Sequence, residues 1–395
     1  MKLKISVAKQ TIEYFIIIFI LFSPESFKYN AYINTFMQVV QAGTFLYCVL
    51  RYGRYFVKAE GTPLKRTIWF ILLYAIYEFV ITYYVGEGYE NTVRSVIIMA
   101  ALGLVLFYGL RNYPMQLLEA LRILIGAYIV IDLITHLFHA QISFLYSINR
   151  IYMLFPVYGM LLYFKDEYSE KNTHIHEILF IISAFFVTIF ATYYMGLGIE
   201  GNFIICNLVM IIPLLVRERK WLSINIWWLC AFIAVINFVF VYLGIQGDIS
   251  VFRYIIVNIL HKDINITGRT ALWTESLKLI RNNWMIGIGS AWRGLSIWNS
   301  YYQPHNQFLY ECIVGGIIGL CLYLAILFYA VRVISQRSGR IEQICKFVLF
   351  SMLLRSSFTN MGLIQTIPYY FILIIAVAVC ENEDITQRVQ MQVAK

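Results

Sequence analysis

A histidine stands at the start of a long apolar run near the C-terminal end of the chain. The segment "YYQPHNQFLYECIVGGIIGLCLYL" begins at Tyr301 and places Pro304 and His305 directly before the apolar residues. Proline suits the first turn of a helix, where its missing N–H leaves no bond unmade. A histidine there would face the positive end of the helix dipole, which favours the neutral imidazole. The pattern predicts a general base at the mouth of a membrane helix. A hydrogen-bonded role at the membrane interface fits the same residues.

Arginines form the second chemical feature of the sequence. Arg269 lies within "TGRTALWTESLKLIRNNW", and other arginines stand near the ends of apolar runs. A guanidinium binds phosphate through two parallel hydrogen bonds, and ionisable residues within membrane segments commonly have a function. We therefore expect an anionic ligand, such as the pyrophosphate of a lipid carrier. Contact with lipid phosphates is the alternative for any one arginine. Further candidates for binding this ligand are Arg94, Arg150, Arg293 and Arg355.

Motifs for other chemistries are absent from the sequence. The six histidines show no HExxH or other metal spacing, and no P-loop, GxSxG, kinase or dinucleotide motif occurs. The seven cysteines lie in apolar segments without CxxC spacing, so we interpret them as small hydrophobic residues. We expect no metal and no cofactor. Gly287 and Gly289 in "GIGSAWRG" indicate a flexible junction before the long apolar run.

Two further features concern how the apolar segments pack. Gly315 and Gly319 form a GxxxG pattern, and such small residues let a membrane helix approach its neighbour closely. Glu78 and Asp132 lie deep within apolar runs. For these two carboxylates we favour pairing with an arginine on a neighbouring helix, and proton transfer is the alternative.

The composition places the chain in the membrane. Hydrophobic residues make up 60% of the 395 residues and charged residues only 13%, with a mean hydropathy of +0.70. Soluble domains carry about 25% charged residues. We predict an all-α, polytopic membrane protein of one domain, residues 1–395, with about twelve transmembrane helices and no cleavable signal. The predicted spans are 11–23, 31–50, 67–85, 92–110, 117–138, 145–164, 178–195, 200–216, 223–244, 306–330, 345–358 and 362–380.

Charge sets the predicted orientation. Basic loops alternate with loops poor in Lys and Arg, and one side receives 21 of the 31 basic residues. The positive-inside rule then puts both termini in the cytoplasm. The net charge of +9 largely reflects this bias. Because the basic residues sit in short, separated loops without a continuous basic face, we expect no binding of nucleic acid.

One predicted loop is much longer than the others and lies on the outer side. Residues 245–304 contain two amphipathic patterns, "VFRYIIVNIL" and "TGRTALWTESLKLIRNNW", and the second is predicted to form a helix between Gly268 and Asn282. Loops longer than about 12–15 residues are usually functional or disordered. Two short helices would form a lid or a wall of a site. The alternative is a pair of interfacial helices without chemistry.

Together these segments resemble a known family. "TGRTALWTESLKLIRNNWMIGIG", followed by "HNQFLYECIVGGIIGLCLYLAIL", is similar to the signature region of the O-antigen polymerase and O-antigen ligase superfamily. The pattern joins a Gly-Arg-x-x-x-Trp segment (Gly268, Arg269, Trp273) to a His-Asn pair (His305, Asn306) that opens a glycine-bearing helix. The similarity covers roughly residues 265–330. The rest of the chain agrees only in layout.

The resemblance implies a metal-independent glycosyltransferase of the bacterial cytoplasmic membrane. Its donor would be a glycan linked to undecaprenyl diphosphate, and its active site would be extracytoplasmic. Arg269 and His305 would be catalytic, with support from Gly268, Trp273 and Asn306. Further arginines of the family, which bind the pyrophosphate, would be matched by Arg150 and Arg355. Arg94 and Arg293 are expected to bind it as well, from their position near the predicted outer face alone. Implied partners are membrane lipid and, in the same pathway, a chain-length regulator and a flippase.

Three functions are compatible with the sequence. A polymerase of lipid-linked repeat units for O-antigen, capsule or exopolysaccharide is our first interpretation. A ligase that transfers a glycan to an acceptor would use the same residues. A transporter of lipid-linked glycans should show charges at several membrane depths and repeated halves. Here the charges gather at the predicted outer face and the halves do not match, so the transporter is the least favoured.

Overall fold

The computed structural model describes residues 2–85, 89–137, 148–167, 178–180, 182, 225–243, 269–292, 294–297, 300–337, 340–359 and 367–381. This part of the chain is mostly helical. Its α-helices are α1 (Lys2–Leu21), α2 (Ala31–Cys48), α3 (Arg54–Lys58), α4 (Pro63–Val85), α5 (Tyr89–Asn112), α6 (Pro114–Leu137), α7 (Ile148–Glu167), α10 (Ile226–Asn237), α13 (Arg269–Asn282), α14 (Gln307–Ser335), α15 (Arg340–Ser356) and α16 (Ile367–Glu381). Other elements are the 3₁₀-helix η1 (Glu25–Tyr29), the π-helices η2 (Val49–Gly53) and η4 (Phe238–Leu243), and the strands β1 (Leu295–Ile297) and β2 (Ser300–Tyr302).

Long apolar helices confirm the membrane class. Four described helical segments are long and apolar enough to cross a bilayer, namely Ala31–Lys58, Pro63–Val85, Glu90–Asn112 and Gln307–Ser335. Each overlaps a predicted span. Helices α1, α6, α7, α10, α15 and α16 overlap further predicted spans. The predicted spans 178–195 and 200–216 lie almost wholly outside the described residues, so the count of twelve stays a prediction.

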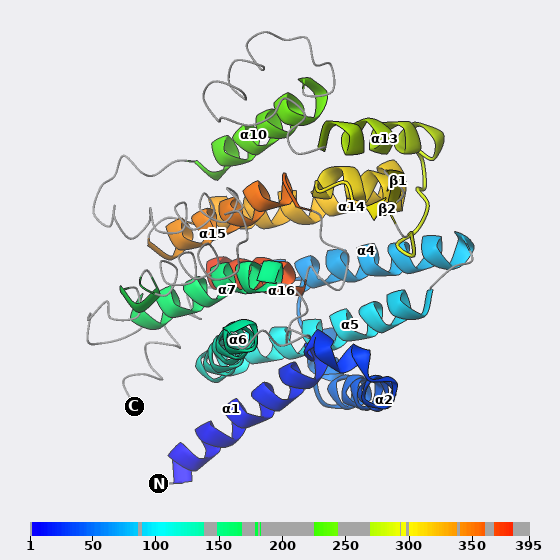
Figure 1. The fold of residues 1–395 in the computed structure, drawn as a ribbon. Helices are drawn as coiled ribbons and strands as arrows, with labels where there is room; N and C mark the ends of the chain where they lie inside the picture. The colour runs from blue at the N-terminus through cyan, green and yellow to red at the C-terminus, as the bar shows by residue number, and fades with distance from the viewer. Residues whose placement is uncertain are drawn as a thin grey trace.

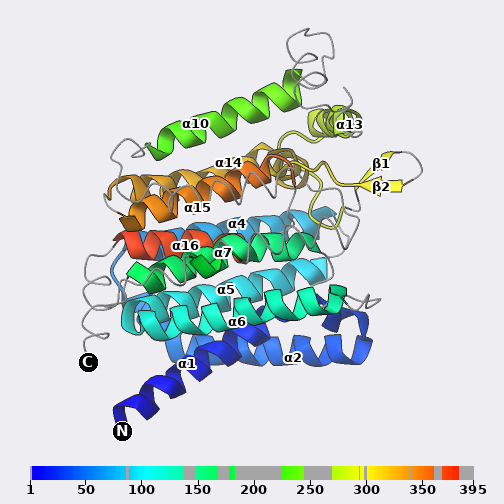
Figure 2. The same cartoon turned by 60° about the vertical axis from the view of Figure 1, so that its left-hand side comes forward.

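The helices lie side by side in layers. Figure 1 shows α4, α5 and α16 in the middle of the molecule, with α1 and α2 on one side and α14 and α15 on the other. Helix α10 and helix α13 cover the outer side of the α14–α15 layer (Figure 2). Helix α14 contacts helices of several layers, namely α4, α10, α13, α15 and α16.

Small residues set the distance between α14 and α4, as the GxxxG pattern predicts. A Cβ atom added at Gly315 or Gly319 would lie 3.4 Å from Cε1 of Tyr77 on α4. The Tyr77 hydroxyl donates a hydrogen bond of 2.8 Å to the Gly315 carbonyl. Larger side chains at these positions would push α4 away from α14.

The predicted flexible junction is wrong, because the glycine-rich segment is docked onto α14. The backbone N–H groups of Ile288 and Gly289 each donate 2.9 Å hydrogen bonds to carbonyls of α14, those of Ile313 and Val314. Gly316 interrupts the helix with φ 61° and ψ −161°. A Cβ on Gly316 would lie 2.3 Å from the Met285 carbonyl oxygen. The glycines therefore serve close backbone contact rather than flexibility.

A two-stranded hairpin leads from this docked segment to His305. Strands β1 and β2 pair antiparallel, with Leu295 opposite Tyr302 and Ile297 opposite Ser300. Gly294 precedes the hairpin with φ 129°, and a Cβ there would lie 2.8 Å from the Tyr302 carbonyl oxygen. The docked segment and the hairpin together hold the connection from α13 to α14 in place.

Candidate functional site

Asn306 is the centre of the site. Its side chain is almost fully buried and caps the N-terminus of α14 by accepting a 3.0 Å hydrogen bond from the Leu309 N–H. Its Nδ2 donates to Asn237 Oδ1 at 2.7 Å and to the Ser357 carbonyl at 2.9 Å. Asn237 ends α10, and Ser357 follows the last residue of α15. One asparagine therefore ties three helices together at one point.

The hydrogen-bond partners of Asn306 are themselves connected. Asn237 Nδ2 donates to Ser357 Oγ at 2.8 Å and to the Ile233 carbonyl at 2.9 Å. The neighbours fix the orientation of both side-chain amides. The Leu309 N–H requires an acceptor, which is Asn306 Oδ1, and the Ile233 carbonyl requires a donor, which is Asn237 Nδ2. Networks in which polar groups are satisfied in this way are rigid.

His305 stands directly before this cap, outside the helix. The helix begins at Gln307 with Asn306 as the N-cap, so the prediction that Pro304 occupies the first helical turn is wrong. Asparagine is among the strongest N-cap residues, which leaves Pro304 and His305 in the approach to the helix. His305 has φ 49°, the only positive φ of a non-glycine residue in the described part of the chain. A left-handed histidine costs free energy and is held there by its surroundings.

Trp273 supplies part of that support. Its side chain is fully buried, and its indole Nε1 donates a 3.0 Å hydrogen bond to the Pro304 carbonyl. Arg269 is the first residue of α13 and is partly buried. Since Arg269 and Trp273 are four residues apart on one helix, they share the same face. The helix predicted between Gly268 and Asn282 is confirmed as α13, and it reaches the His305 segment through Trp273.

Arg355 lies at the same junction. It is in the last turn of α15, and its side chain is only 3% exposed. Ser357, two residues later, accepts the hydrogen bond from Asn306. An arginine buried in a membrane protein is costly and is usually functional. The Asn306 network and Trp273 thus connect the segments that carry Arg269, His305, Asn306 and Arg355.

Other predicted arginines are placed differently. Arg94 Nε donates to Gln41 Oε1 at 2.8 Å, and its NH1 donates to Asn34 Oδ1 at 3.0 Å. Both partners belong to α2, which lies on the far side of α5 from α14 (Figure 1). The structure therefore does not bring Arg94 to Asn306. Arg150 lies in the first turn of α7, but its side chain, together with Gly268 and Arg293, is outside the described residues.

A buried carboxylate that the sequence analysis missed lies below the cap. Glu311 accepts 2.6 Å hydrogen bonds from the Tyr74 hydroxyl and from Gln307 Nε2. Glu78, which we expected to pair with an arginine, is buried nearby on α4 and forms no ion pair within the described residues. The reason is that α4 packs on α14, which presents Glu311 instead of a cation. The sequence feature that could have revealed Glu311 is its position within an apolar run, four residues after Gln307.

The described residues offer no ready metal site, since no three His, Cys, Asp or Glu side chains among them gather closely enough to hold an ion. Asp132, the second deep acid, is buried in α6.

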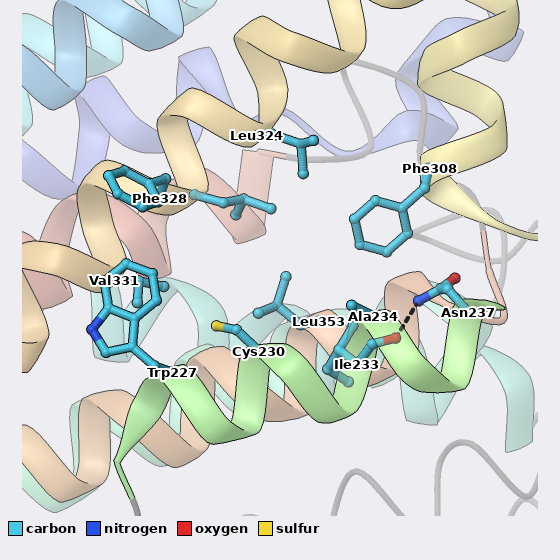
Figure 3. A pocket seen from close by; sticks show the side chains of 11 residues that line it. Trp227, Cys230, Ile233, Ala234, Asn237, Phe308, Leu324, Phe328, Val331 and Leu353 are labelled. Atoms are coloured by element: carbon cyan, nitrogen blue, oxygen red, sulfur yellow. Dashed lines mark hydrogen bonds between the residues drawn. The ribbon is translucent and has the colours of Figure 1, made fainter. Parts of the chain in front are cut away.

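An apolar cavity of about 410 Å³ adjoins the network. Figure 3 shows it between α10 and α14, with Phe308 and Asn237 at one end and Trp227 and Val331 at the other. Asn237 is the same residue that binds Asn306. The cavity therefore runs along the membrane helices and ends at the polar cluster next to His305. Its other lining residues are Cys230, Ile233, Ala234, Leu324, Leu327, Phe328 and Leu353.

Part of this chain is similar to a known protein family. Residues 179–324 match the family model described as O-antigen ligase (Wzy_C). The match covers less than half of the 395 residues and supports the resemblance to the O-antigen ligase and polymerase superfamily. The matched segment contains Arg269, Trp273, His305 and Asn306, and it includes α10, α13 and the first half of α14. No curated protein matches the chain. The match supports a membrane function in glycosyl transfer, which this family implies together with a lipid-linked glycan as substrate.

Proposed function

We propose that this protein is a polymerase of undecaprenyl-diphosphate-linked oligosaccharide repeat units. Its product would be O-antigen, capsule or exopolysaccharide. It would act at the outer face of the bacterial cytoplasmic membrane. One observation carries the proposal: the apolar cavity ends at Asn237, whose side chain is bonded to Asn306 beside His305. A substrate with an apolar chain and a charged head group needs an apolar cavity and a polar site side by side.

The cavity suits the polyprenyl chain of the donor. From Trp227 to Asn237 it follows α10 for about 15 Å at the helical rise per residue. Leu324 and Phe328 on its wall are 42% and 58% exposed, so the cavity is open towards the surrounding lipid. A lipid-borne donor would enter sideways from the bilayer and stop with its head group at the polar cluster.

Arginines bind the pyrophosphate in this proposal. Arg269 and Arg355 stand on segments that meet at the Asn306 network. Arg150 would join them, as the family resemblance implies, and Arg293 would join them from its position near the predicted outer face. Guanidinium groups there would stabilise the negative charge that develops on the leaving diphosphate. Arg94 instead fastens α5 to α2 through its bonds to Gln41 and Asn34.

His305 is the general base. It takes the proton from the attacking sugar hydroxyl as the new bond forms at the anomeric carbon of the donor and the bond to the diphosphate oxygen breaks. The proton ends on the imidazole, and undecaprenyl diphosphate leaves with its negative charge. The reaction draws its energy from the diphosphate linkage and needs no nucleotide. Pro304 and Asn306 flank His305. Trp273 holds Pro304, and Asn237 and Ser357 hold Asn306, so the imidazole keeps its position.

Reconstitution tests the reaction. The purified protein is placed in liposomes with the host's undecaprenyl-diphosphate repeat unit, without nucleotide or added metal, and the products are separated on a gel. We expect a ladder of lengthening glycans with the wild type and none with His305→Ala or Arg269→Ala. A ladder from either variant at near the wild-type rate would remove that residue from the mechanism.

A matched pair of substitutions tests the cavity. Ala234 lines it, and the next residue on α10, Val235, does not and is 57% exposed. Ala234→Trp should fill the cavity and abolish the ladder, whereas Val235→Trp should leave chain growth unchanged. Equal activity of the two variants would show that the donor's chain lies elsewhere.

Accessibility tests the proposed sidedness. Ser300 lies in the hairpin before His305 and is exposed. A cysteine there should react with a membrane-impermeant reagent in intact cells, beyond the level seen with the unsubstituted protein. Labelling only after the membrane is breached would put residues 245–304 in the cytoplasm and reverse the proposed orientation, in which both termini are cytoplasmic.

A ligase is the alternative, because the matching family model carries that description. Its signature would be transfer of a complete glycan to an added acceptor, with no ladder in the acceptor's absence. We expect a chain-length regulator and a flippase of the same pathway to act with the polymerase.

A further inference from the structure

The end of the bundle opposite His305 contains a second hollow, and this one is basic. Its volume is about 670 Å³, and it lies where η2 and α3 pass the end of α5. Four cationic residues line it, with no acidic residue among the lining side chains. Tyr55 and Phe107 form aromatic parts of the wall. The four cations are Arg51, Arg54, Lys58 and Arg111.

Contacts between helix ends place this hollow far from the catalytic residues. The Leu64 N–H at the start of α4 donates to Glu381 Oε2 at 2.6 Å, and Arg337 NH2 just beyond α14 donates to the Glu381 carbonyl at 3.0 Å. The end of α5 and the start of α4 therefore lie at the far end of α14, whose 29 residues span about 43 Å from Asn306. A donor head group at His305 does not reach this hollow. It lies on the side that the charge bias predicts to be cytoplasmic.

The local backbone brings the three cations of this chain segment together. "RYGRYFVK" spaces Arg51, Arg54 and Lys58 by three and four residues, which puts them on one face of a helix. Arg51 lies within the π-helical turn η2, which interrupts the helix between α2 and α3. Single π-turns inside α-helices occur frequently at functional sites. The face so formed turns towards Arg111 at the end of α5.

Only part of this positive charge is compensated. Arg51 is bound to both oxygens of Glu13, through Nε at 2.9 Å and NH2 at 3.0 Å. The Arg111 guanidinium lies 5.3 Å from the centre of the Phe107 ring. Within the described residues, Arg54 and Lys58 have no hydrogen-bond or ion-pair partner and are exposed. The positive-inside bias accounts for basic residues in a loop, but it does not require them to gather around one concave space.

The aromatic wall is suited to the membrane interface. Tyr55 is 56% exposed, and its ring centre lies 4.9 Å from that of Tyr108 on α5. Tyrosines of this kind commonly sit at the level of lipid head groups. Basic pockets between membrane helices on the cytoplasmic side are typical of head-group sites.

We propose that this hollow binds a phosphate-bearing anion at the inner membrane surface, with Arg54 and Lys58 as its principal contacts. The ligand is either the head group of an anionic phospholipid or a soluble phosphate compound, since both present the same anionic oxygens to the cations. The site is separate from the glycosyl-transfer site and does not depend on the proposed function.

Thermal unfolding of the full-length protein in detergent micelles tests the site at an ionic strength of about 0.1 M, where screening beyond about 10 Å is strong. The probes are dihexanoyl phosphatidylglycerol, inorganic pyrophosphate and, as the zwitterionic control, dihexanoyl phosphatidylcholine. A bound probe raises the unfolding temperature in a concentration-dependent way, which gives an apparent affinity. Because the catalytic arginines also attract these anions, the informative quantity is the difference between wild type and variant.

The variant is Arg54→Gln/Lys58→Gln, in which both exposed cations are neutralised. We expect its apparent affinity for the anionic probe to fall roughly thirtyfold, from about 1 kcal/mol per basic residue at an anionic surface. The matched control is Lys9→Gln/Arg332→Gln, which removes the same charge from exposed positions that do not line the hollow. This control should keep the wild-type affinity.

The outcomes separate the sources of the ligand and decide the proposal. Stabilisation by phosphatidylglycerol alone identifies a lipid head group, and stabilisation by pyrophosphate as well identifies a soluble phosphate compound. Equal responses of the wild type and Arg54→Gln/Lys58→Gln would overturn the proposal. So would an equal loss in Lys9→Gln/Arg332→Gln, since the effect would then belong to net charge.

Discussion

Replacing Asn306 with aspartate changes a single heavy atom at the centre of the site. The Oδ1 acceptor that caps α14 through the Leu309 N–H is retained. The Nδ2 donor is lost, and a carboxylate oxygen then faces Asn237 Oδ1 and the Ser357 carbonyl, both of which are acceptors. The substitution therefore preserves the cap and breaks the connection to α10 and α15.

The structure gives the size of the effect. Each acceptor left unpaired in a buried site costs about 1–3 kcal/mol, so the pair costs about 2–6 kcal/mol. A negative charge at a helix N-terminus returns about 0.3–1 kcal/mol. We expect Asn306→Asp to destabilise the protein by about 2–5 kcal/mol and to lower the transfer rate further, because His305 is the preceding residue.

A second N-cap asparagine provides the control. Asn30 caps α2 by accepting from the N–H groups of Tyr32 and Ile33, and its amide nitrogen donates to no described group. Asn30→Asp keeps every bond and should change stability by no more than about 1 kcal/mol. Thermal unfolding in detergent and the reconstituted transfer assay, run on both variants, measure the two effects.

The reasoning would be refuted if Asn306→Asp matched Asn30→Asp in stability and kept wild-type transfer. That result would mean that the donated bonds of Asn306 hold neither α10 nor α15 in place. Loss of transfer without loss of stability would separate the two roles, and it would assign Asn306 to positioning alone.

Further predictions concern the support of His305 and the docking of the glycine-rich segment. Trp273→Phe removes the hydrogen bond to the Pro304 carbonyl but keeps an aromatic ring, so transfer should fall about tenfold or more at a stability cost of about 1–3 kcal/mol. The exposed Trp228→Phe should change neither quantity. Gly316→Ala should destabilise by more than about 3 kcal/mol, because it adds left-handed strain to a backbone clash, and unfolding measurements that show a smaller loss would contradict the close contact. Gly43→Ala, in open space on α2, should be neutral or stabilising by up to about 1 kcal/mol.

Strain at His305 provides a last comparison. His305→Gly and His305→Ala both remove the imidazole and should both stop transfer. Glycine tolerates φ 49° without penalty. The free energy of unfolding of the glycine variant should therefore exceed that of the alanine variant by about 1–2 kcal/mol. Equal stabilities of the two variants, measured by unfolding, would show that the left-handed backbone stores no strain.

Several features of this protein follow from the sequence by itself. The excess of apolar residues requires a membrane environment, because a soluble fold could not bury them. The bounds of α13 follow from an amphipathic repeat with stop signals at Asn282, and the close approach of α14 to a neighbouring helix follows from Gly315 and Gly319. These features are local, since each depends on residues within a few turns of one helix. The signature that joins Arg269 to His305 is likewise readable along the chain.

Only the tertiary structure decided which distant residues meet. Asn306 binds Asn237 and Ser357, which are 69 and 51 residues away in the sequence, and no periodicity links them. The packing of α4 on α14 placed Glu78 near Glu311 rather than near an arginine. The glycines expected to give flexibility became a docking surface once the backbone of the preceding segment lay against Gly316. In each case the polar partner is chosen by which helix faces which, and that choice is made by the packing of the whole bundle.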